Sequence, residues 1–234
     1  MNVMRQVAWF GIFFSFGFLA LQAEETAKKE LKLQDQALNR VYQQLKKELE
    51  GPLFEIVRSD QRDWLQFRDY MSEGQRGDEE FSDQEAQLKM AAGVTEERVE
   101  WLRAWLKSNE KEGLEGRYMD SFGGHLEIAK KDGEYWFQLL VVRGPTFHLG
   151  EIGGKLRVNG GSAWFETREE GVEDPTWLTF VTERDGTSRL RIIGENTQFY
   201  HGSRAYFDGV YLWTGDLSEK ERAAVIAGEE TLKP

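Results

Sequence analysis

The apolar positions of this chain follow two different periods. Up to about residue 114 they recur every three or four residues, which is the period of an amphipathic α-helix. From Gly116 onward they alternate with polar residues, which is the period of a β-strand with one buried face. The change of period predicts an α+β protein in which a helical region precedes an antiparallel β region.

The helical period predicts a small bundle over residues 24–114. One apolar stripe comprises Leu38, Val41, Tyr42, Leu45 and Leu49, and the next comprises Leu53, Val57, Trp64, Phe67 and Met71. Gly51 and Pro52 separate the two stripes, a pairing that ends one helix and begins another. Because the connection is so short, the two helices are expected to form an antiparallel hairpin.

Capping signals predict the remaining helices. Ser82 with Glu85 forms an S-x-x-E capping box that starts a third helix, which Gly93 is expected to end. Thr95 is expected to begin a fourth helix. A second capping box at residues 218–221 predicts a short C-terminal helix.

The β region, residues 115–234, is expected to form an antiparallel meander of about eight strands. Two-residue turn signals join successive strands at Asp132-Gly133, Asn159-Gly160 and Asp185-Gly186. A last strand over residues 205–212 could return to the first, so the fold is either a small up-and-down barrel or a strongly curved sheet. The glycine-rich run 150–154 precedes no helix, so it predicts a turn or bulge rather than a phosphate loop.

The first 23 residues have the pattern of a secretory signal peptide. Arg5 is their only charged residue, and an apolar run covers residues 7–21. A charged start, a short apolar core and a small residue at the exit predict cleavage after Ala23. The alternative is an uncleaved membrane anchor, although the run is shorter than the ~20 apolar residues of a typical span. The pattern therefore predicts an exported protein, periplasmic or extracellular.

Charge and composition exclude several classes of function. The 234 residues include 30 basic and 41 acidic ones, so the net charge is -11, and it becomes -12 when Arg5 leaves with the signal. A chain this acidic is poorly suited to bind phosphate backbones, so nucleic acid is not an expected partner. Because the chain has no Cys, it carries no disulfide, thiolate nucleophile, Cys-ligated metal or lipoprotein anchor.

A polar signature runs through the predicted hairpin. Its residues are Asp35, Leu38, Asn39, Tyr42, Gln61, Trp64, Arg68 and Asp69. Their spacing is D-x-x-L-N-x-x-Y followed by Q-x-x-W-L-x-[YF]-R-D. In these motifs the chain resembles the N-terminal domain of the LprI-like lysozyme inhibitors, which are exported bacterial proteins, over about residues 27–106. Members of that family usually carry Cys residues flanking the hairpin, and this chain has Tyr70, Met71 and Ser72 after the R-D pair.

The resemblance implies a protein that binds lysozyme or another cell-wall hydrolase and occludes its basic active-site cleft. The polar residues of the signature can also be explained without reference to the family. Hydrogen bonds and an Arg–carboxylate pair between the two helices could fix the register of the hairpin. The other possibility is that these residues form the surface that a partner recognises.

Two acidic clusters and one aromatic residue are candidates for partner binding. The first cluster is Asp78, Glu79, Glu80, Asp83 and Glu85, and the second is Glu166, Glu169, Glu170, Glu173 and Asp174. Long-range attraction would steer such clusters toward basic lysozymes, although a charge run is often only a solvated face. Trp136 lies on the strand face opposite Tyr135 and Phe137, where it is either exposed for binding or covered by another part of the chain.

Catalytic and metal-binding signals are weak. The three His residues, His125, His148 and His201, lack the short ligand spacing of a metal site, and there is no G-x-S-x-G elbow. No catalytic residue, metal or cofactor is therefore expected. The alternative to an inhibitor is a module in which the β region holds a small apolar molecule or a cell-wall fragment. A wall-active hydrolase, which requires two facing carboxylates, ranks last.

Overall fold

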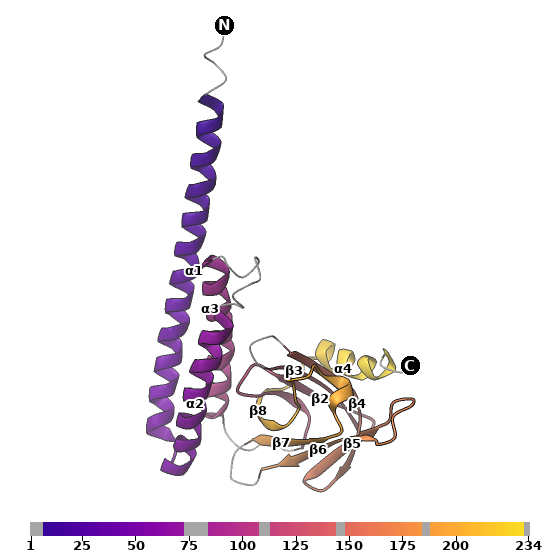
Figure 1. Cartoon of the computed structure of the whole chain (residues 1–234). Coiled ribbons are helices and arrows are strands. Elements are labelled where there is room, and N and C mark those ends of the chain that lie inside the picture. Colours follow the sequence, from indigo (N-terminus) through magenta and orange to yellow (C-terminus); the bar gives the residue numbers. More distant parts are fainter. Residues whose placement is uncertain (1–6, 73–83, 108–112, 144–147, 184–187, 232–234) are drawn as a thin grey trace.

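The computed structural model describes residues 7–72, 84–107, 113–143, 148–183 and 188–231, with side chains from Gln22 to Gly228 among them. Three helices stand beside a closed barrel of eight antiparallel strands, and a short helix follows at the C-terminus (Figure 1). The predicted α+β class is confirmed. The eight strands form a closed barrel, so the alternative of an open, strongly curved sheet is excluded.

The helical region consists of α1 (Val7–Glu48), α2 (Gly51–Ser72) and α3 (Gln84–Ala104). The first half of α1 extends beyond the other two helices, and the second half packs against them (Figure 1). α1 is continuous through Ala23, so signal cleavage there stays a prediction. Within the described residues, no helix combines the length and apolar character that a membrane span requires.

The predicted helix break at Gly93 is wrong. α3 runs without interruption through Gly93, which is exposed and has open space where a side chain would be. Thr95 does not cap a new helix, because its hydroxyl donates to the carbonyl oxygen of Ala91 at 2.6 Å within α3. A glycine inside a helix costs only about 1 kcal/mol, and the burial of Val94 and Val99, which follow Gly93 in the same helix, outweighs this cost. The predicted cap at Ser82 lies outside the described residues.

The strands follow one another around the barrel in sequence order. They are β1 (Gly116–Met119), β2 (His125–Lys131), β3 (Glu134–Arg143), β4 (His148–Asn159), β5 (Ser162–Thr167), β6 (Thr176–Thr182), β7 (Arg189–Glu195) and β8 (Gly209–Gly215). β1 pairs with β8 and closes the barrel. The turn at Asp132-Gly133 is confirmed. The hairpin predicted at Asn159-Gly160 is present, but its turn is Gly160-Gly161, because Asn159 is the last residue of β4 and pairs with Ser162. Asp185-Gly186 lies outside the described residues.

Two predictions about the β region are corrected. The last strand begins at Gly209 rather than near residue 205, because Ala205 and Phe207 are buried in an irregular segment that precedes it. The glycine-rich run 150–154 is neither a turn nor a bulge, since it lies within β4 and pairs with β3 in unbroken register. Because Gly150 and Gly154 have no Cβ, neighbouring side chains pack directly against their backbone.

One apolar cluster fills the interior of the barrel. Its largest members are Phe137, Phe180, Phe207 and Tyr211, all of them fully buried. The ring of Phe137 lies 5.1 Å from the ring of Phe180, in an edge-to-face arrangement. The alternating apolar positions of the strands thus supply a packed core.

The C-terminal helix α4 (Glu219–Thr231) begins with the predicted capping box. The backbone N–H of Ser218 donates to the Glu221 carboxylate at 2.7 Å, and the N–H of Glu221 donates to the Ser218 hydroxyl at 3.3 Å. Val225 of α4 packs with Ala129 and Leu217 against the outside of the barrel. This helix therefore covers one outer face of the sheet (Figure 1).

The helical region and the barrel share a hydrophobic cluster. Met119 of β1 and Leu212 of β8 belong to the apolar cluster of the helices, together with Trp101 and Leu102 of α3. α3 also contacts β8 directly. The two regions are therefore in close contact through apolar side chains.

Candidate functional site

The signature residues of the hairpin divide between its core and its surface. Leu38 and Trp64 are buried, and the ring of Tyr42 lies 5.4 Å from that of Phe54 on α2. Asn39 is exposed on α1. The apolar members therefore hold α1 and α2 together, while Asn39 faces solvent.

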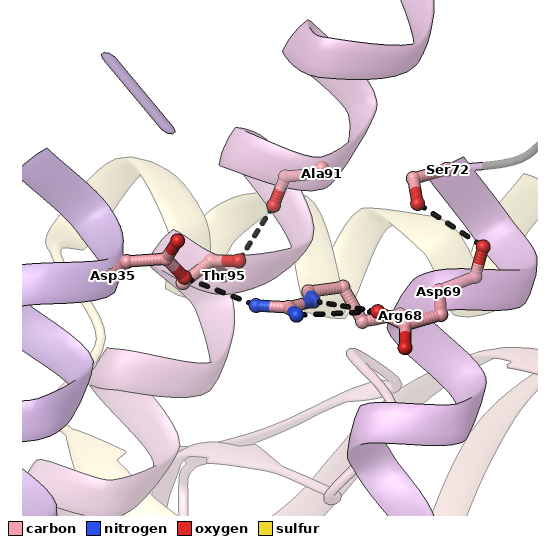
Figure 2. Close-up of polar contacts among 6 residues, drawn as sticks. All are labelled: Asp35, Arg68, Asp69, Ser72, Ala91 and Thr95. Atoms are coloured by element: carbon pink, nitrogen blue, oxygen red, sulfur yellow. Dashed lines mark hydrogen bonds and ion pairs between the residues drawn. The ribbon is translucent and has the colours of Figure 1, made fainter. Parts of the chain in front are cut away.

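Arg68 is the polar link between α2 and α1 (Figure 2). Its Nη1 lies 3.0 Å from Oδ1 of Asp35 on α1, and its Nη2 lies 3.2 Å from Oδ1 of Asp69. The guanidinium carbon also lies 5.4 Å from the centre of the Trp64 ring. The structure thus brings four of the signature residues together, and one arginine contacts the other three.

Gln61 does not bond across to α1. Its Oε1 accepts a hydrogen bond from Nε of Arg98 on α3 at 2.9 Å. Nη1 of Arg98 lies 2.7 Å from Oδ2 of Asp60, and the Arg98 side chain is fully buried. Gln61 therefore connects α2 to the third helix.

Arg98 is a central residue that the sequence analysis missed. Its guanidinium lies between two aromatic rings, 5.3 Å from the centre of Trp64 and 4.1 Å from that of Trp101. Burial lowers the pKa of Arg98, and the Asp60 carboxylate opposes that effect. The sequence contained one indication that Arg98 is buried. Arg98 lies three residues before Trp101 and four after Val94, so it falls on the apolar face of the helix.

A second buried ion pair lies where the barrel meets the helices. Arg143 of β3 pairs with Asp120, and both side chains are only 4% exposed. Oδ1 of Asp120 accepts hydrogen bonds from the backbone N–H groups of Phe122 and Gly124, at 2.9 and 2.7 Å. Burial acts to lower the pKa of Arg143, but the Asp120 carboxylate together with Tyr211 and Tyr206 outweighs burial, so the pKa is raised.

The loop that follows Asp120 contacts the helices directly. Nη1 of Arg98 donates to the carbonyl oxygen of Ser121 at 3.3 Å, and the ring of Phe122 lies 5.2 Å from that of Phe67 on α2. The two buried arginines therefore contact neighbouring residues of one short loop, Arg143 at Asp120 and Arg98 at Ser121. This arrangement positions the barrel against α2 and α3.

With this geometry described, the chain was compared with known proteins. Residues 20–102 match the family described as Lysozyme inhibitor LprI. The helical region is an LprI-like domain. The match ends at Leu102, before the barrel begins, and comparisons with curated proteins and with solved structures gave no match.

The acidic clusters do not lie within the hairpin of the LprI-like domain. Of the first cluster only Glu85 is among the described residues, where it lies 2.6 Å from Lys89 one turn along α3. The second cluster extends from Glu166 of β5 into the loop before β6. Glu169 accepts a hydrogen bond from the Tyr200 hydroxyl, whereas Glu170, Glu173 and Asp174 are exposed.

Trp136 is covered by the chain itself. It packs with Val225 and Ile226 of α4 against the outside of the barrel. Nζ of Lys155 lies 5.6 Å from the centre of its ring. The ring is half-buried, which corresponds to packing by the C-terminal helix rather than to a freely exposed aromatic surface.

The His residues do not converge on a common site. Both ring nitrogens of His201 have partners, the Thr197 hydroxyl at 3.0 Å and the Gly202 carbonyl at 2.9 Å. Over the described ranges, no group of three or more His, Asp or Glu side chains is placed to hold a metal ion.

Proposed function

We propose that this protein is exported and inhibits lysozyme or another basic cell-wall hydrolase by covering its active-site cleft. The observation that carries the proposal is the match of residues 20–102 to the LprI inhibitor family, with the signature residues on a formed helical hairpin. Inhibition needs binding and steric occlusion, so the proposal assigns no catalytic residue to this chain.

One face of α2 is suited to contact the partner. Ile56, Asp63 and Tyr70 follow one another at intervals of seven residues, so they lie on one side of the helix. Ile56 is 49% exposed and Tyr70 is 46% exposed, and Asp63 is exposed between them. Two apolar side chains on either side of a carboxylate can combine packing with attraction to a basic surface.

The acidic charge supports the proposal through the rate of association. At a net charge of -11, the chain attracts a basic protein over a distance of about a Debye length, which is ~10 Å at 0.1 M salt. Exposed carboxylates such as Glu170, Glu173 and Asp174 contribute to this field. Salt is therefore expected to weaken binding mainly by slowing association.

The test is titration of the chain beginning at Glu24 against a panel of lysozymes, with a cell-wall lysis assay on the same samples. Ala27 is the first buried side chain among those described, so the start at Glu24 removes no buried contact of the described side chains. We expect saturable binding that weakens as salt rises, together with loss of lysis. Absence of heat and unimpaired lysis across the panel would contradict the proposal for those enzymes.

Two variants test whether this face of α2 contacts the partner. Ile56→Ser with Tyr70→Ala is expected to reduce the affinity at least tenfold while leaving the thermal midpoint nearly unchanged, because both side chains are exposed. Leu33→Ser is the matched control, since Leu33 is 63% exposed on α1 and lies outside this face. Equal affinity for both variants would exclude the α2 face as the contact surface.

A further inference from the structure

The wall of the barrel opens between β4 and β5. β4 pairs with β3 from His148 to Leu156, but its ladder with β5 joins only Arg157–Asn159 to Ser162–Trp164. Beyond the Arg157–Trp164 pair the two strands separate. We call this opening the seam, bounded by residues 151–155 of β4 and residues 165–167 of β5.

A close contact explains where the ladder ends. Gly154 has a φ of +157°, and the ring of Phe165 occupies the place where a Cβ on Gly154 would stand. The same ring lies 5.1 Å from that of Phe137 inside the barrel. Phe165 thus packs against the backbone of β4 and into the core, and β5 departs from β4 at this point.

Every second residue of β4 directs its backbone N–H and C=O groups toward the seam. The N–H of Gly202 donates to the carbonyl oxygen of Leu149 at 2.9 Å, so that carbonyl points away from β3. Because backbone direction alternates and the β3–β4 register is unbroken, the N–H and C=O groups of Glu151 and Gly153 point the same way. No residue of β5 is paired with either.

The chain already adds a short segment to this edge of β4. Gly150 and His201 form an isolated antiparallel bridge beside the Leu149–Gly202 hydrogen bond. In an antiparallel bridge of this kind the N–H of Glu151 faces the carbonyl oxygen of Tyr200, so that segment reaches the level of Glu151. The N–H and C=O groups of Gly153 come next along the edge, where a further strand could continue the pairing.

A cavity of about 500 Å³ occupies the seam. It is lined by Glu151, Ile152, Gly153, Phe165, Arg168, Glu169, Glu170 and Tyr200, together with neighbouring loop residues. Ile152 is buried at 3% exposure, whereas Glu151 and Glu170 are exposed. This volume lies within the range of ~300–1,000 Å³ that is typical of ligand sites.

The charged lining favours a cation. Three carboxylates, those of Glu151, Glu169 and Glu170, face the cavity against the single guanidinium of Arg168. The Tyr200 hydroxyl donates to Glu169, and burial together with this carboxylate raises the pKa of Tyr200 to about 12. The hydroxyl therefore stays protonated and keeps the Glu169 side chain at the cavity.

We propose that the seam binds an extended peptide segment carrying a cationic side chain, which pairs as a strand with Gly153 of β4. Main-chain hydrogen bonds would hold the segment, and the carboxylates would select its charge. This goes beyond the proposed inhibition, because the seam lies in the barrel, outside residues 20–102.

The test uses the exported protein and the blocked peptide acetyl-Lys-Val-Lys-Val-Lys-amide. We expect saturable binding and at least tenfold slower hydrogen exchange at the amide of Gly153. An analogue with alternate backbone nitrogens methylated has the same charge but lacks donors, so it is expected to bind at least tenfold more weakly. Equal binding of both peptides, or unchanged exchange at the Gly153 amide, would overturn the proposal.

Charge is tested separately. The double variant Glu169→Gln with Glu170→Gln is expected to weaken binding of the Lys peptide at least fivefold. Glu173→Gln is the matched control, because Glu173 is exposed in the same loop and does not line the cavity. A thermal melt verifies that both variants fold. Equal affinity for the two variants, or equal binding of a peptide with Glu in place of Lys, would contradict a cation-selective seam.

Discussion

Charged side chains cross between the helices of the LprI-like domain, whereas main-chain ladders around an apolar core hold the barrel together. Arg68 joins α2 to Asp35 of α1, and the buried Arg98 of α3 contacts Asp60, Gln61 and two Trp rings. In the barrel, eight strands pair in sequence order around Phe137 and Phe180. The two regions therefore depend on different kinds of sequence information.

This difference explains which region can be matched to a family. An ion pair or a stacked arginine requires a particular residue at a particular spacing, so the helices carry a signature that comparison can detect. Main-chain pairing is possible for almost any residue, and many apolar side chains can fill the interior. The barrel thus follows from a pattern of alternation, and it forms outside residues 20–102, which are the residues that match the family.

The largest effect is expected from Phe137→Ala, which tests whether the two regions unfold separately. Phe137 is fully buried and contacts Phe165 and Phe180, so truncation is expected to lower the free energy of unfolding by about 3–5 kcal/mol. Met119 and Leu212 lie in the apolar cluster of the helices, so we expect the amides of β3 and α3 to lose protection together. Loss confined to β3 in hydrogen exchange would show that the barrel unfolds alone.

Arg98→Ala tests the helical side of the comparison. Removal of the guanidinium leaves Asp60 and Gln61 without their partner and empties the space between Trp64 and Trp101. We expect the free energy of unfolding in urea to fall by about 3 kcal/mol. Arg103→Ala is the control, since Arg103 is exposed on the same helix and is expected to change stability by only about 0.5 kcal/mol. Equal losses would refute a special role for the buried arginine.

Sequence patterns predicted most of the fold and less of the candidate site. The alternation of apolar and polar residues, together with the turn pairs, predicted the antiparallel meander. The capping box at residues 218–221 predicted the start of α4. The break at Gly93 was wrong because tertiary packing overrides a single glycine. The seam was missed because the glycines of β4 indicate a turn until Phe165 is seen to pack against Gly154. Arg98 and Arg143 were missed because a charge is expected at the surface.

Glu97→Gln is expected to have a smaller effect on stability, and this effect depends on pH. Burial, and then the charge of Asp120 with smaller contributions from Glu100 and Glu96, raises the pKa of Glu97 in the folded chain. The folded state therefore binds more protons than the unfolded state between the usual Glu pKa of 4.5 and the raised value, so stability falls as pH rises through that interval.

Glu97→Gln removes this unfavourable charge. The variant is expected to have a higher thermal midpoint than the parent chain at pH 7 and the same midpoint below pH 4.5, where the Glu97 carboxyl is protonated in both states. Scanning calorimetry at both values measures the difference. An equal gain at both pH values would show that packing, rather than ionisation, is responsible.

The smallest effect on stability is expected from Asp35→Asn, which separates the two interpretations of the hairpin signature. Asp35 is 44% exposed, and exposed ion pairs contribute only about 0.5 kcal/mol, which a double-mutant cycle with Arg68→Gln can measure. Because the Asp35–Arg68 pair joins α1 to α2 and Asp35 lies outside the α2 face of Ile56 and Tyr70, we expect the affinity for lysozyme to stay unchanged. A tenfold loss of affinity at unaltered stability would instead make the signature part of the recognition surface. The sequence match would then reflect what the helices bind rather than how they pack.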